Sequence, residues 1–216
     1  MAKCAHGRVP PGASSPTDST AASVAATATL ELQRRRDRRD DHALWHRPRA
    51  HLAKPLMTRS TSRRPPLSTA DAFGMEAALE EARAAARAGE VPVGAAVVNK
   101  GEIVSRAHNE TVGRNDLTQH AELIAIQRAL AALAVDRLDD ASLCVTLEPC
   151  AQCAGAILLA RVGRVLFGAY DPKAGMAGSI GDLLRHPKLN HRPEVRGGIR
   201  EEECALVLAE FFGERR

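Results

Sequence analysis

Apolar and polar positions follow the periods of helices and strands from residue 69 onward. Residues 69–88 are rich in Ala, Glu and Arg, contain no Pro, and end before Gly89, so they predict an amphipathic helix. Two short apolar runs, 95–99 and 102–107, flank Lys100-Gly101 and predict a β-hairpin. The chain therefore opens its patterned part with a helix followed by a hairpin.

The remaining pattern alternates helices with strands. It predicts a helix from residue 120 to about 134, a strand over 141–147, a helix over 151–160, a strand over 164–168, a short helix over 180–184 and a terminal helix over 203–212. Helices that alternate with strands favour an α/β fold, because each helix can cover a face of the sheet. We expect a three-layer α/β/α sandwich around one mostly parallel portion of sheet.

The first third of the 216-residue chain differs from the rest. Residues 1–70 carry 13 Lys/Arg against 5 Asp/Glu, a balance of +8, whereas residues 71–216 carry 17 against 21, a balance of −4. Residues 1–70 are also rich in Pro, Ser and Thr, which predicts a disordered, basic extension. A start at Met57, an RNA-binding arm and an organelle transit peptide are three explanations of this extension. Residues 71–216 are the predicted catalytic domain.

Residues 146–154, Thr-Leu-Glu-Pro-Cys-Ala-Gln-Cys-Ala, join the end of a predicted strand to the start of a predicted helix. Cys150 and Cys153 then share a face of the first helical turn, where unpaired backbone N–H groups favour thiolates. A CxxC pair at such a turn fits a metal site, a thioredoxin-like redox site or two inert buried thiols.

His120-Ala121-Glu122 favours the metal site. A His, a Glu two residues later and a downstream Pro-Cys-x-x-Cys resemble the signature of zinc nucleobase deaminases. Three ligands, His120, Cys150 and Cys153, leave the fourth position of a tetrahedral zinc open, as in catalytic sites, and the sequence has no second CxxC to close it. Positions i and i+2 do not share a helical face, so we expect His120 to lie at the non-helical start of its helix. Glu122 is then the candidate proton carrier between the attacking water, the ring nitrogen and the leaving amine.

Composition places the chain in a reducing compartment. Five cysteines, two of them in the candidate metal site, argue against a disulfide framework. There is no apolar run of membrane-spanning length and no secretion signal in the sequence, so we expect a cytoplasmic protein without a membrane partner.

A wider set of residues resembles the bacterial tRNA-specific adenosine deaminases, over about residues 71–212. The matching stretches are residues 90–95, Asn109, residues 120–122, 147–156, 167–173, Gly178-Ser179, residues 186–192 and residues 203–205. The chain departs from the family pattern at Leu117 and Gln119, and at Arg185, where a histidine is usual.

The resemblance implies a cytidine deaminase-like fold with a mixed, about five-stranded sheet. It also implies a homodimer with one zinc per subunit, which hydrolyses the wobble adenosine to inosine in the anticodon loop of tRNA, expected to be an arginine tRNA. The substrate-binding residues that it implies are Val91, Pro92, Asn109, Ala121, Asp171, His186, Asn190 and Arg192. Single-stranded loop RNA is a suitable target, because an unstacked base enters a pocket at low cost.

Two other functions stay open at this point. A free-base or nucleoside deaminase acting on guanine or cytidine would share the zinc motif without needing loops that face RNA. A zinc-holding accessory subunit would bind RNA while a partner performs the chemistry, but such a subunit would have no use for Glu122.

Overall fold

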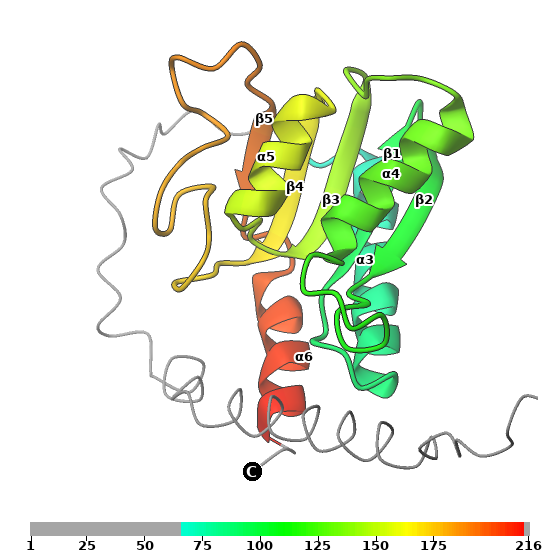
Figure 1. Cartoon of the computed structure of the whole chain (residues 1–216), viewed down its shortest axis with the longest axis vertical. Helices are drawn as coiled ribbons and strands as arrows, with labels where there is room; N and C mark the ends of the chain where they lie inside the picture. The colour runs from blue at the N-terminus through cyan, green and yellow to red at the C-terminus, as the bar shows by residue number, and fades with distance from the viewer. Residues whose placement is uncertain (1–65, 214–216) are drawn as a thin grey trace, which may run out of the picture. The chain divides into compact units, whose positions relative to one another are not determined.

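The computed structural model describes residues 66–213, and the expectations for residues 1–65 lie outside this range. The elements are α3 (Thr69–Arg87), β1 (Gly94–Asn99), β2 (Glu102–His108), α4 (Ala121–Leu133), β3 (Ala141–Leu147), α5 (Ala151–Leu159), β4 (Arg164–Ala169), β5 (Glu194–Gly197) and α6 (Glu201–Gly213). All the longer predicted elements are present, with ends shifted by one or two residues (Figure 1). Within the described range no helix is both long and apolar enough to cross a membrane.

One mixed sheet of five strands, in the order β2-β1-β3-β4-β5, forms the middle layer. The pairs β1–β2 and β1–β3 are antiparallel, and the pairs β3–β4 and β4–β5 are parallel. The expectation of a mixed, five-stranded α/β sheet is therefore confirmed, although only half of it is parallel. Since β3 and β4 are parallel, the segments that follow them leave the sheet at the same edge.

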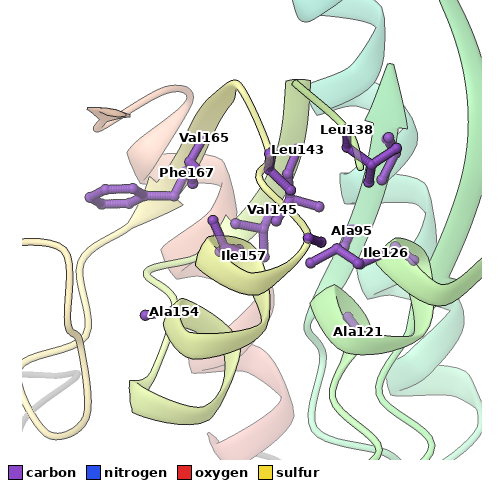
Figure 2. Close-up of a cluster of buried hydrophobic side chains, with 14 of the residues drawn as sticks. Ala95, Ala121, Ile126, Leu138, Leu143, Val145, Ala154, Ile157, Val165 and Phe167 are labelled. Atoms are coloured by element: carbon purple, nitrogen blue, oxygen red, sulfur yellow. The ribbon is translucent and has the colours of Figure 1, made fainter. Parts of the chain in front are cut away.

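Helices cover both faces of the sheet. On one face α4 and α5 lie side by side in front of the strands (Figure 1), and Ile126 of α4 and Ile157 of α5 belong to one buried apolar cluster with Leu143 and Val145 of β3 (Figure 2). On the other face a second apolar cluster joins α3 and α6 to the strands through Met75, Leu79, Val98, Cys144, Leu166 and Cys204. A Cβ at Gly94 would lie 2.1 Å from the carbonyl oxygen of Ala78, so glycine at the start of β1 permits the close approach of α3. The result is the expected three-layer sandwich.

The predicted short helix over 180–184 is wrong. Its backbone donors bond outside the helical pattern: the N–H of Ile180 donates to the carbonyl of Gly175, and that of Leu183 to the carbonyl of Met176. Ala177 and Asp182 form an isolated antiparallel bridge instead. The apolar residues that suggested a helix thus belong to a folded loop.

The hydrophobic pattern did not predict β5. This strand has only four residues, Glu194–Gly197, with one fully buried position, Val195. Its partner β4 supplies the pairing, with Val195 opposite Val165. A strand this short and polar depends on an adjacent sheet edge that local sequence does not reveal.

A buried ion pair joins α3 to β4. The side chain of Asp71 is 2% exposed, and its carboxylate accepts from both terminal nitrogens of Arg164, at 3.0 and 3.2 Å. Ser68, the N-cap of α3, also donates to Asp71. Because this carboxylate lies inside the protein, its charge is balanced only by these partners.

We expect Arg164→Met to lower the free energy of unfolding by about 2–3 kcal/mol, because the mutation leaves the Asp71 charge buried without its partner. The matched control is Arg161→Met. Arg161 has a similar exposure, 39% against 42%, but its partner Asp139 is 49% exposed, so we expect a loss of at most about 0.5 kcal/mol. Urea unfolding of both variants measures the difference, and equal losses would contradict the importance of the buried Asp71 charge.

Candidate metal and catalytic centre

The candidate centre lies where the amino ends of α4 and α5 meet. His120 is the N-cap of α4 and Cys150 is the N-cap of α5, and both have extended backbone, with φ/ψ of −80°/149° and −75°/178°. Pro149 lies between β3 and α5. It helps to end the strand because proline has no backbone N–H to donate to a neighbouring strand. His120 is thus at the non-helical start of its helix, as the i, i+2 spacing required. Two helix amino ends also give the centre a positive potential.

The side chains of His120, Cys150 and Cys153 converge. The Nδ1 atom of His120 lies 3.6 Å from the Sγ of Cys150 and 3.5 Å from the Sγ of Cys153. All three ligand atoms lie within 4.8 Å of one another, so the group could hold a metal ion. Zinc–sulfur bonds of about 2.3 Å and zinc–nitrogen bonds of about 2.0 Å at tetrahedral angles place nitrogen and sulfur about 3.5 Å apart. The observed spacing fits a tetrahedral ion bound by these three residues.

The environment favours the thiolate form of one of the two cysteines. The hydrogen bond from Cys153 chiefly lowers the pKa of the Cys150 thiol to about 4, with a further contribution from His120. In turn, the bond to Cys150 raises the pKa of Cys153, and burial raises it further. Cys150 is therefore the thiolate of the pair, and Cys153 keeps its proton until a cation binds both sulfurs, because metal ligands must be deprotonated.

Glu122 lies beside this group, in the first turn of α4. Its residue is only 4% exposed, and burial raises the pKa of its carboxyl group. The Cys153 side chain partly offsets this rise in pKa, so the carboxyl group lies near a candidate ligand. A buried carboxyl group that can exist in both protonation states suits proton transfer.

Asn109 holds the start of α4 in place. Its Oδ1 accepts from the backbone N–H of Ala121 at 2.9 Å, and the residue is 7% exposed. The backbone N–H of Asn109 donates to the carbonyl of Val93, which places the 91–93 segment beside it. Pro92 is buried and Val91 is partly buried in this segment. The structure thus brings the predicted residues Val91, Pro92, Asn109 and Ala121 to the same helix end as His120.

Asp171 lies near the candidate ligand Cys150, on the loop that follows β4. Its Oδ1 accepts from the backbone N–H of Lys173 at 2.9 Å, which forms an Asx turn. The residue is 9% exposed, and burial raises the pKa of its carboxyl group. The carboxylate therefore has a turn-forming role in addition to the substrate contact that was predicted.

Two buried glutamates outside the predicted set hold the loops around the centre. Glu148 accepts from the backbone N–H groups of Asp171, Ala177 and Ser179 at 2.8–3.1 Å, and also from the Ser179 hydroxyl. Glu90 accepts from Thr111 and from the N–H groups of Val112 and Gly113. In the sequence, Glu148 stands out only as a charged residue at the end of an apolar run. Its hydrogen-bond donors lie more than 20 residues away, so the local sequence does not indicate them.

The other predicted RNA-facing residues do not reach the His–Cys–Cys group. His186, Asn190 and Arg192 are exposed on the long connection between β4 and β5. Their neighbour His191 donates from Nε2 to the carbonyl of Val162, before the start of β4, at 2.7 Å. Cys150 follows the carboxyl end of the parallel strand β3, so Asn190 and Arg192 lie toward the opposite edge of the sheet.

The sequence of the chain is similar to those of known deaminases. The family model described as MafB19-like deaminase matches residues 70–216. A tRNA-specific adenosine deaminase of Bacillus subtilis (strain 168) is 47% identical over 148 residues, which cover 68% of this chain and 92% of that protein.

Solved structures give a similar picture. A structure from a study of A-to-I editing by tRNA:A34 deaminases at the wobble position of transfer RNA has 44% identity and a TM-score of 0.61. It covers 63% of this chain and 99% of its own. A guanine deaminase from Nitrosomonas europaea has a TM-score of 0.59 over 69% of this chain and 87% of its own, but at 21% identity it shares the fold alone.

Proposed function

The chain belongs to the tRNA-specific adenosine deaminases within the MafB19-like deaminase family, and from this we propose that it hydrolyses adenosine to inosine at the wobble position of tRNA. We propose an arginine tRNA as the substrate, read through its anticodon stem-loop. The observation that carries the proposal is the His–Cys–Cys group with buried Glu122 beside it, in a chain 47% identical to a tRNA-specific adenosine deaminase.

We propose zinc as the metal, one ion per subunit, held by His120, Cys150 and Cys153. Two sulfurs and one imidazole nitrogen are the ligands that zinc prefers, and three protein ligands leave one position open. Bound zinc would supply an activated water as the nucleophile toward C6 of adenine. Every other step of the reaction falls to groups of the chain itself.

Glu122 is the proposed proton carrier. Its carboxylate takes a proton from the attacking water, donates it to the ring nitrogen, and then helps the amino group leave as ammonia. Burial supports this role because a desolvated carboxyl group is not held permanently ionised. Asn109 and Ala121, at the start of α4, contact the base, and Val91 and Pro92 form the apolar wall of its pocket.

Recognition of RNA is divided between two regions. We propose that Asp171, on the loop beside Cys150, meets the ribose of the target nucleotide. His186, Asn190 and Arg192 lie farther off, so we propose that they contact RNA outside the target nucleotide. We also propose that the protein is a cytoplasmic homodimer.

The test is a comparison of substrates with the full chain. We would incubate the 216-residue protein with deacylated tRNA and, separately, with free adenosine, guanine and cytidine, and then quantify inosine, xanthine and uridine. The expected result is inosine at the wobble position of an arginine tRNA, and no turnover of the free compounds. Turnover of guanine or cytidine with unchanged tRNA would identify a free-base or nucleoside deaminase and refute the RNA substrate. A chain that holds zinc, binds tRNA and turns over none of them would be an accessory subunit.

A further inference from the structure

Arg185, on the long connection between β4 and β5, bonds to two other residues of this connection and to one residue of β5. Its Nη1 donates to the carbonyl oxygen of Ala177 at 3.0 Å and to Oδ2 of Asp182 at 2.8 Å, and its Nη2 donates to the carbonyl oxygen of Val195 at 3.2 Å. The side chain is 32% exposed. Two of these bonds go to backbone carbonyl groups and the third goes to the exposed carboxylate of Asp182, so the guanidinium group donates to acceptors of the protein itself.

The first of these bonds connects Arg185 to the candidate centre. The peptide groups on both sides of Ala177 are held: its N–H donates to the buried carboxylate of Glu148 at 2.8 Å, and its carbonyl accepts from Arg185. Glu148 also accepts from the N–H of Asp171 and is followed directly by Pro149 and Cys150. An anion and a cation therefore hold one peptide segment in a fixed position beside the pocket.

The bond to Val195 closes a loop. Val195 lies in β5 and accepts from Arg185, so residues 186–194 form a loop whose two ends are joined by this hydrogen bond. This loop lies along the β5 side of the sheet (Figure 1), and its far part is held by His191 on Val162 and by the N–H of Glu194 on Gly163. It carries His186, Asn190 and Arg192, the three residues proposed to meet RNA. Closing the loop at its base removes conformations that binding would otherwise have to select.

We propose that Arg185 is a positioning residue for tRNA: it joins the loop beside the base pocket to the RNA-facing loop, so that both are presented in one arrangement. The inference rests on the proposed function. Arg185 itself does not contact the phosphate backbone. Its contribution to affinity comes from the three acceptors that it holds in the protein.

Lysine at position 185 separates this role from a direct phosphate contact. A lysine keeps the positive charge but offers one point donor, which cannot bridge acceptors on three segments. If Arg185 bound phosphate, Arg185→Lys would retain most of the affinity. If it positions the loops, Arg185→Lys and Arg185→Gln will be equally impaired.

The experiment measures tRNA affinity against salt concentration, steady-state kinetics and amide hydrogen exchange for the wild type, Arg185→Lys, Arg185→Gln, Arg192→Gln and Arg106→Lys. For both Arg185 variants we expect KM and Kd for tRNA to rise about tenfold with kcat within about twofold, and exchange over 177–195 to become faster. Their slope of log Kd against log salt stays at the wild-type value, whereas Arg192→Gln lowers its magnitude by about 0.7, the value for one phosphate contact with a single strand.

Arg106→Lys is the control for the chemical change from arginine to lysine. Arg106 forms an exposed ion pair with Glu80 at 2.8 Å, and we expect its lysine variant to keep wild-type affinity.

Asp182→Asn completes a mutant cycle, because Asp182 accepts from both the backbone and the side chain of Arg185. We expect its effect on Kd to be non-additive with that of Arg185→Lys. A smaller salt slope in Arg185→Gln with normal affinity in Arg185→Lys would overturn the proposal and assign a phosphate contact instead. Unchanged exchange over 177–195 would also overturn it. A wild-type protein that neither binds nor deaminates tRNA would refute the proposed function. The exchange measurement does not depend on tRNA, so it would still report whether Arg185 holds residues 177–195 in place.

Discussion

Replacing Glu122 with glutamine is expected to lower the rate of adenosine deamination in tRNA by about 10²–10⁴-fold while leaving the fold intact. Glutamine has the size of glutamate but cannot take up and return a proton. Because Glu122 is 4% exposed and burial disfavours its charged form, a neutral amide at this position costs no desolvation of charge. Thermal stability should therefore equal or exceed that of the wild type.

Single-turnover formation of inosine, zinc content and melting temperature would be measured together. Glu102→Gln, at an exposed position of β2, is the matched control and should keep full activity. A Glu122→Gln protein with normal zinc content and near-normal rate would refute the proton-transfer role. Low activity with low zinc content would instead assign Glu122 to metal retention.

The second large effect is expected from Cys153→Ala, which removes a proposed ligand. Mutating a residue that only orients a metal ligand typically lowers metal affinity by up to about 100-fold. Loss of the ligand sulfur itself should lower zinc affinity further, and tRNA deamination should become undetectable. The variant should also lose the stabilisation that bound zinc gives to the folded state. Zinc content by elemental analysis, together with melting curves with and without added zinc, measures these effects independently of activity.

Cys204→Ala provides the control. Both thiols are buried, at 0% and 1% exposure, but Cys204 lies on α6 in the cluster that packs on the other face of the sheet. We expect Cys204→Ala to bind zinc normally and to melt at a higher temperature when zinc is present, as the wild type should. If the two variants lost zinc to the same extent, the assignment of Cys153 as a ligand would be wrong.

The candidate centre was accessible from the sequence because its determinants are local. Cys150 and Cys153 follow an apolar strand and open a helix, and the i, i+2 spacing of His120 and Glu122 required a helix start at His120, where the structure has one. The two segments come together because β1 and β3 are adjacent and the helices that start at the centre pack on the same face. Hydrophobic periodicity predicts such packing well.

The features that the sequence did not predict depend on distant partners. β5 exists because β4 offers a free edge, and residues 180–184 form a folded loop because their donors bond to the 175–176 region and not to a helical ladder. Glu148 accepts from donors 23–31 residues away, and Arg185 reaches Val195 across a loop. Propensity contains no information on such long-range hydrogen bonds, so the organisation of the loops that follow β3 and β4 required the structure.

The contact between Asn109 and the start of α4 selects the orientation of the side-chain amide that we propose to contact the base. Because the N–H of Ala121 occupies Oδ1, the other end of the same amide is an NH₂ group, which can only donate. The orientation of this amide is thus selected by a helix end before any nucleotide arrives, and it does not have to flip to suit a ligand. We therefore expect the proposed base pocket to accept a ring nitrogen with a lone pair at this position and to reject a protonated one, which meets a donor. Under the proposed function, part of the choice among nucleobases would follow from the folding of α4.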